Sequence, residues 1–290
     1  MLQIVGIVVV FGMVFGGYMM AGGHMEVITH ALPHEMIVIG GAAIGQLLIG
    51  NELSTIKSLG GDFGKLLSGP KWKKQDYQDL LSLLFTLTKL VKQKGVVALE
   101  PHIEKPHESK IFERYPKILK DHFAVDFICD TFRMTTMNLD DPHQVEDAME
   151  KQLEKHHHDA LKAPHALQNM ADALPALGIV AAVLGIIKTM GSINEPPEKL
   201  GMMIGSALVG TFMGVFLAYG LVGPFATRIT AIHEEEGSFY RIIKDVMVAH
   251  LHGNAAQISV EIGRGGVPST MQPSFAQLEE AVAQAAAEAA

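Results

Sequence analysis

The sequence predicts an all-α membrane protein with four transmembrane helices and a mostly helical cytoplasmic domain. Hydrophobic residues make up 48% of the 290 residues and charged residues only 19%, below the roughly 25% charge of soluble domains. The apolar residues are concentrated in four stretches that are almost free of charge. Glycine is abundant, with 29 residues, while aromatic residues reach only 7%, a composition typical of closely packed membrane helices.

The first two stretches lie near the beginning of the sequence. Residues 1–21 contain no charged side chain. This uncharged stretch is long enough to cross a bilayer core. No Lys or Arg precedes this stretch, as a cleaved signal peptide would require, so we expect a retained span. The second stretch, 36–50, is short, and it spans only if His34 and Glu35 lie in the headgroup zone.

The third and fourth stretches lie in the second half of the chain. Residues 171–190 carry Asp172 and Lys188 near the ends, and no charged residue occurs between Lys199 and Arg228. We therefore expect the chain to be divided as follows: transmembrane helices 1 and 2 in 1–50, a cytoplasmic helical domain in 51–170, transmembrane helices 3 and 4 in 171–226, and a cytoplasmic helix and tail in 227–290.

The basic residues predict the orientation. Of the 23 Lys and Arg residues, 17 lie in 51–170, none in 22–35 and two in 188–199. Basic residues near membrane ends prefer the cytoplasm. We expect 22–35 and 188–199 to be short outer turns, with both termini cytoplasmic.

The cytoplasmic segments read as helices. Leucines at helical spacing predict one helix over 77–91, and a second apolar pattern predicts another over 118–134. Asp141 before Pro142 is a capping signal for a helix that runs towards the third span. Pro164 either interrupts this helix or kinks it.

The fourth span is expected to continue past Pro224 as one helix through 227–250. Gly263 and Gly265 predict loops in the tail, and Ser274 with Gln277 predicts a capped helix over 275–288. Glycines four residues apart predict close helix packing. These pairs are Gly12 and Gly16, Gly41 and Gly45, Gly201 and Gly205, and Gly210 and Gly214.

Several function classes are disfavoured. Neither GxxxxGK[ST], GxGxxG nor HExxH occurs, so we expect no enzyme and no cofactor. The single cysteine excludes a multi-cysteine metal site, and the net charge of −8 disfavours nucleic-acid binding. The run 156–158 is three consecutive histidines, whose side chains point in different directions on a helix. We expect a solvated face there, as for the glutamates at 234–236, and no metal.

The spans themselves limit the ion chemistry. Ion pathways usually carry an acid or His near mid-membrane, and we expect Asp172 and Glu35 to lie only at edges. A titrating carboxylate would then come from another chain. Thr211 lies mid-span, where its hydroxyl either bonds back to the preceding turn or faces an ion path. Pro175 and Pro224 lie near the inner ends of the third and fourth spans.

Five separated segments together carry a family resemblance. They are VFGGYMMAGG at the start, LEPHIEKPHESKIFERYPKIL (99–119), LPALGIVAAVLG (174–185), LVGTFMGVFLAYGLVGPFAT (208–227) and QPSFAQLEE (272–280). In this order, and over nearly the whole chain, they resemble the MotA family, the membrane subunits of flagellar motor stators.

The resemblance implies an assembly and a mechanism. MotA-like chains form a ring of five around two copies of MotB, whose single span carries an ion-binding aspartate. Ion flow across the inner membrane would rotate the ring and apply torque to the rotor protein FliG. Membrane lipid would surround the spans, and no nucleic acid is involved.

The resemblance also implies roles for individual residues. Glu100 matches the rotor-facing acid. Lys92 matches the rotor-facing base, where the family usually has Arg, so the charge remains but the bidentate fork is lost. Lys89 or Lys94 could share that role.

Four further positions match the ion pathway and its coupling to rotation. Pro175 and Pro224 match two structurally important prolines, and Thr211 matches the pore-side threonine. Ala182 stands where sodium-driven relatives have a threonine, which favours protons as the driving ion.

Three other interpretations remain open from the sequence. An ExbB or TolQ-like proton-driven subunit is the nearest, but such chains look like three-span proteins. A secondary transporter would need a mid-membrane substrate site, usually in two related halves. A non-conducting scaffold is the third, and co-purification with a partner carrying one intramembrane aspartate would separate a stator from the last two.

Overall fold

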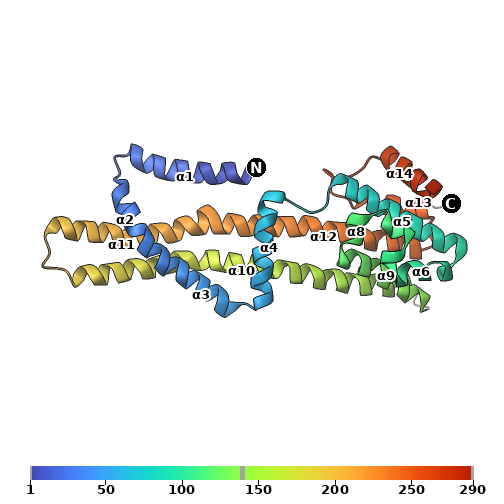
Figure 1. The fold of residues 1–290 in the computed structure, drawn as a ribbon, viewed down its shortest axis with the longest axis horizontal. Helices are drawn as coiled ribbons and strands as arrows, with labels where there is room; N and C mark the ends of the chain where they lie inside the picture. The colour runs from blue at the N-terminus through green and yellow to red at the C-terminus, as the bar shows by residue number, and fades with distance from the viewer. Residues whose placement is uncertain (1, 138–140, 289–290) are drawn as a thin grey trace. The chain divides into compact units, whose positions relative to one another are not determined.

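The computed structural model describes residues 2–137 and 141–288, the last three of these by backbone alone, and forms two compact units. The first unit comprises the chain up to Gly69 together with Ala160–Ile232, and the second comprises Pro70–Asp159 and the chain from His233 onward. Figure 1 shows the helices of both units. Met1 and residues 138–140, 289 and 290, which fall in the expected segments 1–50, 51–170 and 227–290, lie outside the described residues.

Four helical runs in the described chain are long and apolar enough to cross a membrane, which confirms the predicted fold class. The first is α1 (Leu2–Met20), and the third is the apolar part of α10 (Pro142–Met190). The second combines α2 (Met25–Glu35), the π-helical turn η1 (Met36–Gly40) and α3 (Gly41–Gly50). The fourth combines α11 (Pro197–Leu217), the π-helical turn η4 (Ala218–Val222) and α12 (Gly223–Leu251).

The second span is longer than predicted. It begins at Met25 rather than Met36, so most of the expected outer turn 22–35 is helical. The backbone N–H of Met36 donates to the carbonyls of Leu32 and Pro33, which carries the helix across the polar stretch. Glu35 consequently lies inside the helical run, close to the midpoint of Met25–Gly50, and its placement at a membrane edge stays a prediction.

Prolines are accommodated inside long helices. Helix α10 runs through Pro164 and Pro175 without a break, so Pro164 does not end it. The fourth span continues beyond Pro224 to Leu251, as predicted. Proline lacks a backbone N–H, and just before Pro224 the ladder widens to a π turn in which Gly223 N–H donates to the Ala218 carbonyl.

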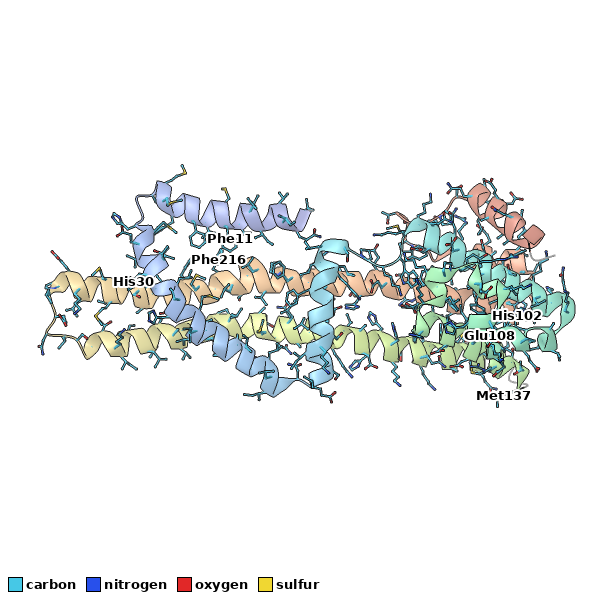
Figure 2. All side chains as sticks on the ribbon, in the orientation of Figure 1. Phe11, His30, His102, Glu108, Met137 and Phe216 are labelled. Atoms are coloured by element: carbon cyan, nitrogen blue, oxygen red, sulfur yellow. The ribbon has the colours of Figure 1, made fainter. Side chains whose placement is uncertain are left out.

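The first unit is held together by aromatic contacts and by close backbone packing. Phe11 of α1 meets Phe216 of α11 edge to face, with ring centroids 5.1 Å apart (Figure 2). A Cβ atom on Gly214 would lie 2.5 Å from the Leu174 carbonyl oxygen and 2.9 Å from Gly178 Cα. Helices α10 and α11 therefore approach each other as only small residues allow.

Of the predicted glycine pairs, Gly210 and Gly214 form the packing surface between α10 and α11. Gly205 faces Val27 of α2. At the other five positions a Cβ would meet nothing within 4 Å in this chain. These are Gly12, Gly16, Gly41, Gly45 and Gly201. The amphipathic helix α4 (Leu53–Ser68) completes the unit and buries Leu59 and Leu66.

The second unit has a core of large apolar side chains. Its helices are α5 (Lys74–Lys94), α6 (Glu100–Glu104), α7 (Lys110–Glu113), α8 (Pro116–Leu119), α9 (His122–Thr136), α13 (Ala256–Gly265) and α14 (Phe275–Glu288), with parts of α10 and α12. Two 3-10 turns, η2 (Val96–Ala98) and η3 (Pro106–Glu108), connect them. Trp72 stacks on Phe239 with centroids 3.8 Å apart, and the single cysteine, Cys129, is buried in the same core.

Two local predictions for this unit were wrong. The expected helix over 118–134 is split, because the Asp121 side chain accepts a hydrogen bond from Ala124 N–H and starts α9 there. Gly263 and Gly265 belong to α13 rather than to a loop. Gly263 is needed where α13 meets α12, since a Cβ there would lie 2.3 Å from a Val246 methyl carbon.

Both predicted caps of this unit are present. Asp141 accepts a hydrogen bond from His143 N–H at 3.0 Å, directly at the start of α10. Ser274 accepts one from Gln277 N–H at 3.2 Å, and Gln277 reciprocates to Ser274 N–H at 3.0 Å. These bonds satisfy N–H groups that the helix ladder leaves free.

Candidate functional site

The predicted ion-path residues lie at the contact between α10 and α11. A Cβ on Gly210 would meet the Ala181 Cβ and the Ala182 backbone nitrogen, both at 3.2 Å. Ala182 is buried, and Thr211 follows Gly210 and is half-buried. The structure therefore brings Ala182 against the residue next to Thr211.

The Thr211 hydroxyl differs from those of the other threonines of the third and fourth spans. Thr189, Thr227 and Thr230 each donate to the carbonyl four residues earlier, at 2.9–3.0 Å. Thr211 makes no hydrogen bond to any residue that the structure describes. Its hydroxyl thus keeps both its donor and its acceptor capacity.

Glu35 was missed as a site residue in the sequence interpretation. Its side chain is only 9% exposed, and its Oε2 would lie 2.6 Å from a Cβ on Gly210. This oxygen has no hydrogen-bond partner in the described part of the chain. A signal was available: Glu35 falls in the helical series of buried residues Ile28, Ala31, Ile39 and Ala43.

The two prolines lie on the third and fourth spans, Pro175 in α10 and Pro224 in α12. Pro175 follows Leu174, whose carbonyl oxygen touches the backbone of α11 at Gly214. Pro224 is exposed and lines a groove of about 530 Å³ together with Asp172, Tyr219 and Thr227. Each proline therefore removes a helix N–H, Pro175 next to the contact between α10 and α11 and Pro224 at the groove.

Lys92 and Glu100 lie in the second unit, on either side of a turn. Helix α5 ends at Lys94, and Gly95 turns the chain with a positive φ of 80° that favours glycine. Both side chains are exposed, and no ion pair joins them within the described ranges. Lys92 Nζ donates to the carbonyls of Gly253 and Asn254, each at 3.2 Å.

Buried neighbours fix the short helix that presents Glu100. Leu99, which precedes this helix, and Ile103 within it are almost completely buried. Arg133 of α9 donates to the Ile103 carbonyl at 2.9 Å and to Glu104 at 2.7 Å. Glu100 is therefore an exposed carboxylate on a rigid base, which suits a charged contact surface.

A second contact closes the loop after α6. His102 Nδ1 and Ser109 Oγ are 2.8 Å apart, and burial lowers the pKa of His102. Figure 2 shows His102 and Glu108 in this region. The neutral form of His102 is thereby favoured, so the imidazole adds little positive charge near Glu100.

The basic alternatives to Lys92 differ in environment. Lys89 is half-buried, with Nζ 5.6 Å from the centroid of the Phe85 ring, whereas Lys94 is exposed. The three histidines at 156–158 also differ from one another in their environment. His156 stacks on Phe123 with centroids 3.7 Å apart, and His157 and His158 are exposed.

Two family models match the chain. Residues 4–95 match the motility protein A N-terminal family, and residues 120–241 match the MotA/TolQ/ExbB proton channel family. The motility proteins A of Salmonella typhimurium and Escherichia coli K12 are each 39% identical to it, over 97% of this chain and 95% of theirs. The chemotaxis protein LafT of Vibrio parahaemolyticus is 32% identical over 98% of this chain and 99% of its own.

Solved structures share the fold. The C. jejuni MotAB structure matches with a TM-score of 0.70 and 16% identity, over 92% of this chain and 95% of the other. The flagellar MotAB stator complex of Bacillus subtilis matches with a TM-score of 0.66 and 20% identity, over 89% and 92%.

Proposed function

We propose a mechanism from the premise that the chain belongs to the motility protein A family: it is a stator subunit of the flagellar motor. It is a membrane protein with four apolar helices in the described chain, and its relatives in the proton channel family are not enzymes. The observation that carries this function is the match to Salmonella motility protein A along 97% of the chain. The N-terminal family match over 4–95 favours this family over an ExbB or TolQ-like subunit.

The proposed complex contains five copies of this chain around two MotB-like subunits in the inner membrane. Both termini, 51–170 and 227–290 would be cytoplasmic, with the spans in 1–50 and 171–226 in contact with lipid. The basic residues concentrated in 51–170 support this orientation. Extensive exposed apolar surface on α1, where no residue of Leu2–Met20 is buried, supports contact with lipid or neighbouring subunits.

The proposed driving ion is the proton. Protons would reach the aspartate of the MotB-like span past Thr211, whose hydroxyl makes no bond within the described chain and is available to orient water. Ala182 offers no side-chain hydroxyl, so a sodium ion would lose hydration without enough ligands in return. Pro175 and Pro224 would let α10 and the fourth span shift as that aspartate gains and loses its proton.

The proposed rotor contact is the exposed pair Lys92 and Glu100, facing FliG. Glu100→Lys is expected to abolish most swimming while leaving membrane assembly intact, because it reverses a charge on a rigid surface. A charge reversal on FliG should partly restore swimming. The matched control is Glu108→Lys, another exposed acid of the same unit, and normal swimming of Glu100→Lys would end this assignment.

The overall function is tested by complementation. The chain, expressed with the MotB of its own organism in cells that lack a stator, should restore rotation of tethered cells. Rotation should persist when external sodium is replaced by potassium, and Thr211→Val should slow it. Failure of the wild-type pair to rotate the motor would refute the stator role, and loss of rotation on sodium removal would refute the proton assignment.

A further inference from the structure

We infer that Glu35 is a proton-binding group of the ion-conducting machinery, contributed by this chain itself. This inference rests on the proposed stator function and deepens it. The sequence interpretation placed every titrating carboxylate of the pathway on the partner. The structure instead buries a glutamate of α2 close to the midpoint of the second span.

The geometry places this carboxyl group at a three-helix junction. Gly210 of α11 meets Glu35 on one side and Ala181 and Ala182 of α10 on the other. A side chain at position 210 would occupy the space of Glu35 Oε2, since its Cβ would lie 2.6 Å from that oxygen. The absence of a side chain at Gly210 is what admits the carboxyl group between the helices, beside the residue that precedes Thr211.

The adjacent His34, when protonated, is the one potential counter-charge in the electrostatic surroundings that act on Glu35 within the described chain. The fourth span carries no charged residue between Lys199 and Arg228, and α10 carries none between Asp172 and Lys188. The titratable groups of its own helix are Glu26, His30 and His34, with His24 just before the helix, and His34 is adjacent to Glu35 in sequence. Helix α1 and the turns η1 and η4 contribute no charged side chain.

These surroundings favour the neutral carboxyl and make ionisation dependent on a nearby acceptor. An isolated carboxylate at this depth is costly, and acids retained inside spans usually serve ion or proton paths. A group used only for packing would be better served by an apolar side chain, because an unpartnered buried oxygen destabilises the fold. The exchange is a simple proton transfer: the O–H bond of Glu35 breaks, and water in the path or the partner's carboxylate accepts the proton.

Glu35→Gln tests the inference, because the amide has nearly the same shape but carries no exchangeable acid proton. The complex with the MotB-like subunit should still assemble, while proton flux into vesicles and motor speed fall by about tenfold or more. Glu35→Asp should retain intermediate flux. The matched control is Glu26→Gln, which removes an exposed acid from the same helix and should leave the flux unchanged.

Infrared difference spectra of the assembled wild-type complex give a second readout that does not depend on the variant assembling. A protonated carboxyl band should change with pH, shift in Glu35→Asp and persist in Glu26→Gln. Wild-type flux in an assembled Glu35→Gln complex, or no Glu35-dependent band, would overturn the inference. Failure of the wild-type chain itself to conduct would instead refute the proposed function, so the two failures are distinguishable.

Discussion

The unit that contains the four apolar helices is packed through backbone contacts, whereas the other unit is packed through large side chains. In the first, Gly178, Gly185, Gly210 and Gly214 allow α10 and α11 to touch. In the second, rings and leucines fill the interior, and Trp72, Tyr77, Phe127 and Phe239 are almost fully buried.

The difference follows from the solvent that each unit is suited to. Lipid offers no hydrophobic drive for two apolar helices to associate, so close van der Waals contact must hold them. In water, removing apolar area from solvent contributes about 25 cal/mol per Å². The exposed apolar side chains are accordingly concentrated in the spans, as at Leu2, Ile49 and Ile187, which are 82%, 90% and 62% exposed.

The largest expected effect comes from adding volume to the spans. Gly214→Val should prevent α10 and α11 from packing, because the new atoms would overlap the Leu174 carbonyl and the Gly178 backbone. Overpacking of this kind typically costs about 1–3 kcal/mol, and we expect more here because backbone atoms block the space. The yield of folded protein in detergent should fall sharply.

Gly201→Val is the control for that substitution, since it lies on the same helix with nothing within 4 Å. If Gly214→Val and Gly201→Val are equally well folded, close backbone contact is not what packs the spans, and the contrast between the two units fails.

The next largest effect comes from removing volume in the second unit. Leu84 is fully buried in the leucine-rich core, so Leu84→Ala should destabilise the unit by about 2–5 kcal/mol. Trp72 is the single tryptophan and lies in this core, so its fluorescence reports unfolding in the full chain. Val97→Ala, at a side chain 75% exposed, should change stability by less than about 0.5 kcal/mol.

Alkaline pH should weaken the second unit selectively. Burial, with added repulsion from Glu235 and Asp76, raises the pKa of Tyr77 to about 12, whereas an unfolded tyrosine titrates near pH 10. The neutral phenol therefore contributes a stabilisation of about 3 kcal/mol. This stabilisation is complete below pH 10 and is lost as the pH rises to 12. Tyr77→Phe should lose less stability over this range, followed by Trp72 fluorescence, and an unchanged pH dependence would contradict the assignment.

The smallest expected effect is at a helix end. Ser274→Ala removes the hydroxyl that accepts a hydrogen bond from Gln277 N–H and should destabilise α14 by about 1 kcal/mol. Hydrogen exchange should accelerate in the first turn of α14 and stay unchanged in α5. Equal acceleration in both helices would mean that α14 is not a local unit.

Hydropathy predicted the spans well because membrane helices are defined by long apolar runs. It missed residues 25–35, because histidines and glutamates lower the average even where the helix continues. The capping signals at Asp141 and Ser274 were sufficient to predict where α10 and α14 begin, since the donor and the acceptor of each capping hydrogen bond lie within one helical turn. They are therefore among the features that sequence alone predicts best.

The features that sequence did not predict depend on distant partners. Asp121 ends one helix and begins another, and it also binds Lys71 Nζ at 2.5 Å and the Tyr240 hydroxyl at 3.0 Å, each far away along the chain. The helical placement of Gly263 depends on contact with Val246. Glu35 is a site candidate only because Gly210 lies opposite it.

The buried Cys129 has a practical consequence for labelling. Burial raises the pKa of its thiol to about 12, so the thiolate, which is the reactive form, is strongly disfavoured at neutral pH. We therefore expect the native chain to react with maleimides very slowly. A cysteine introduced at an exposed position such as Glu100 or Val97 would carry a single spectroscopic probe without any further substitution.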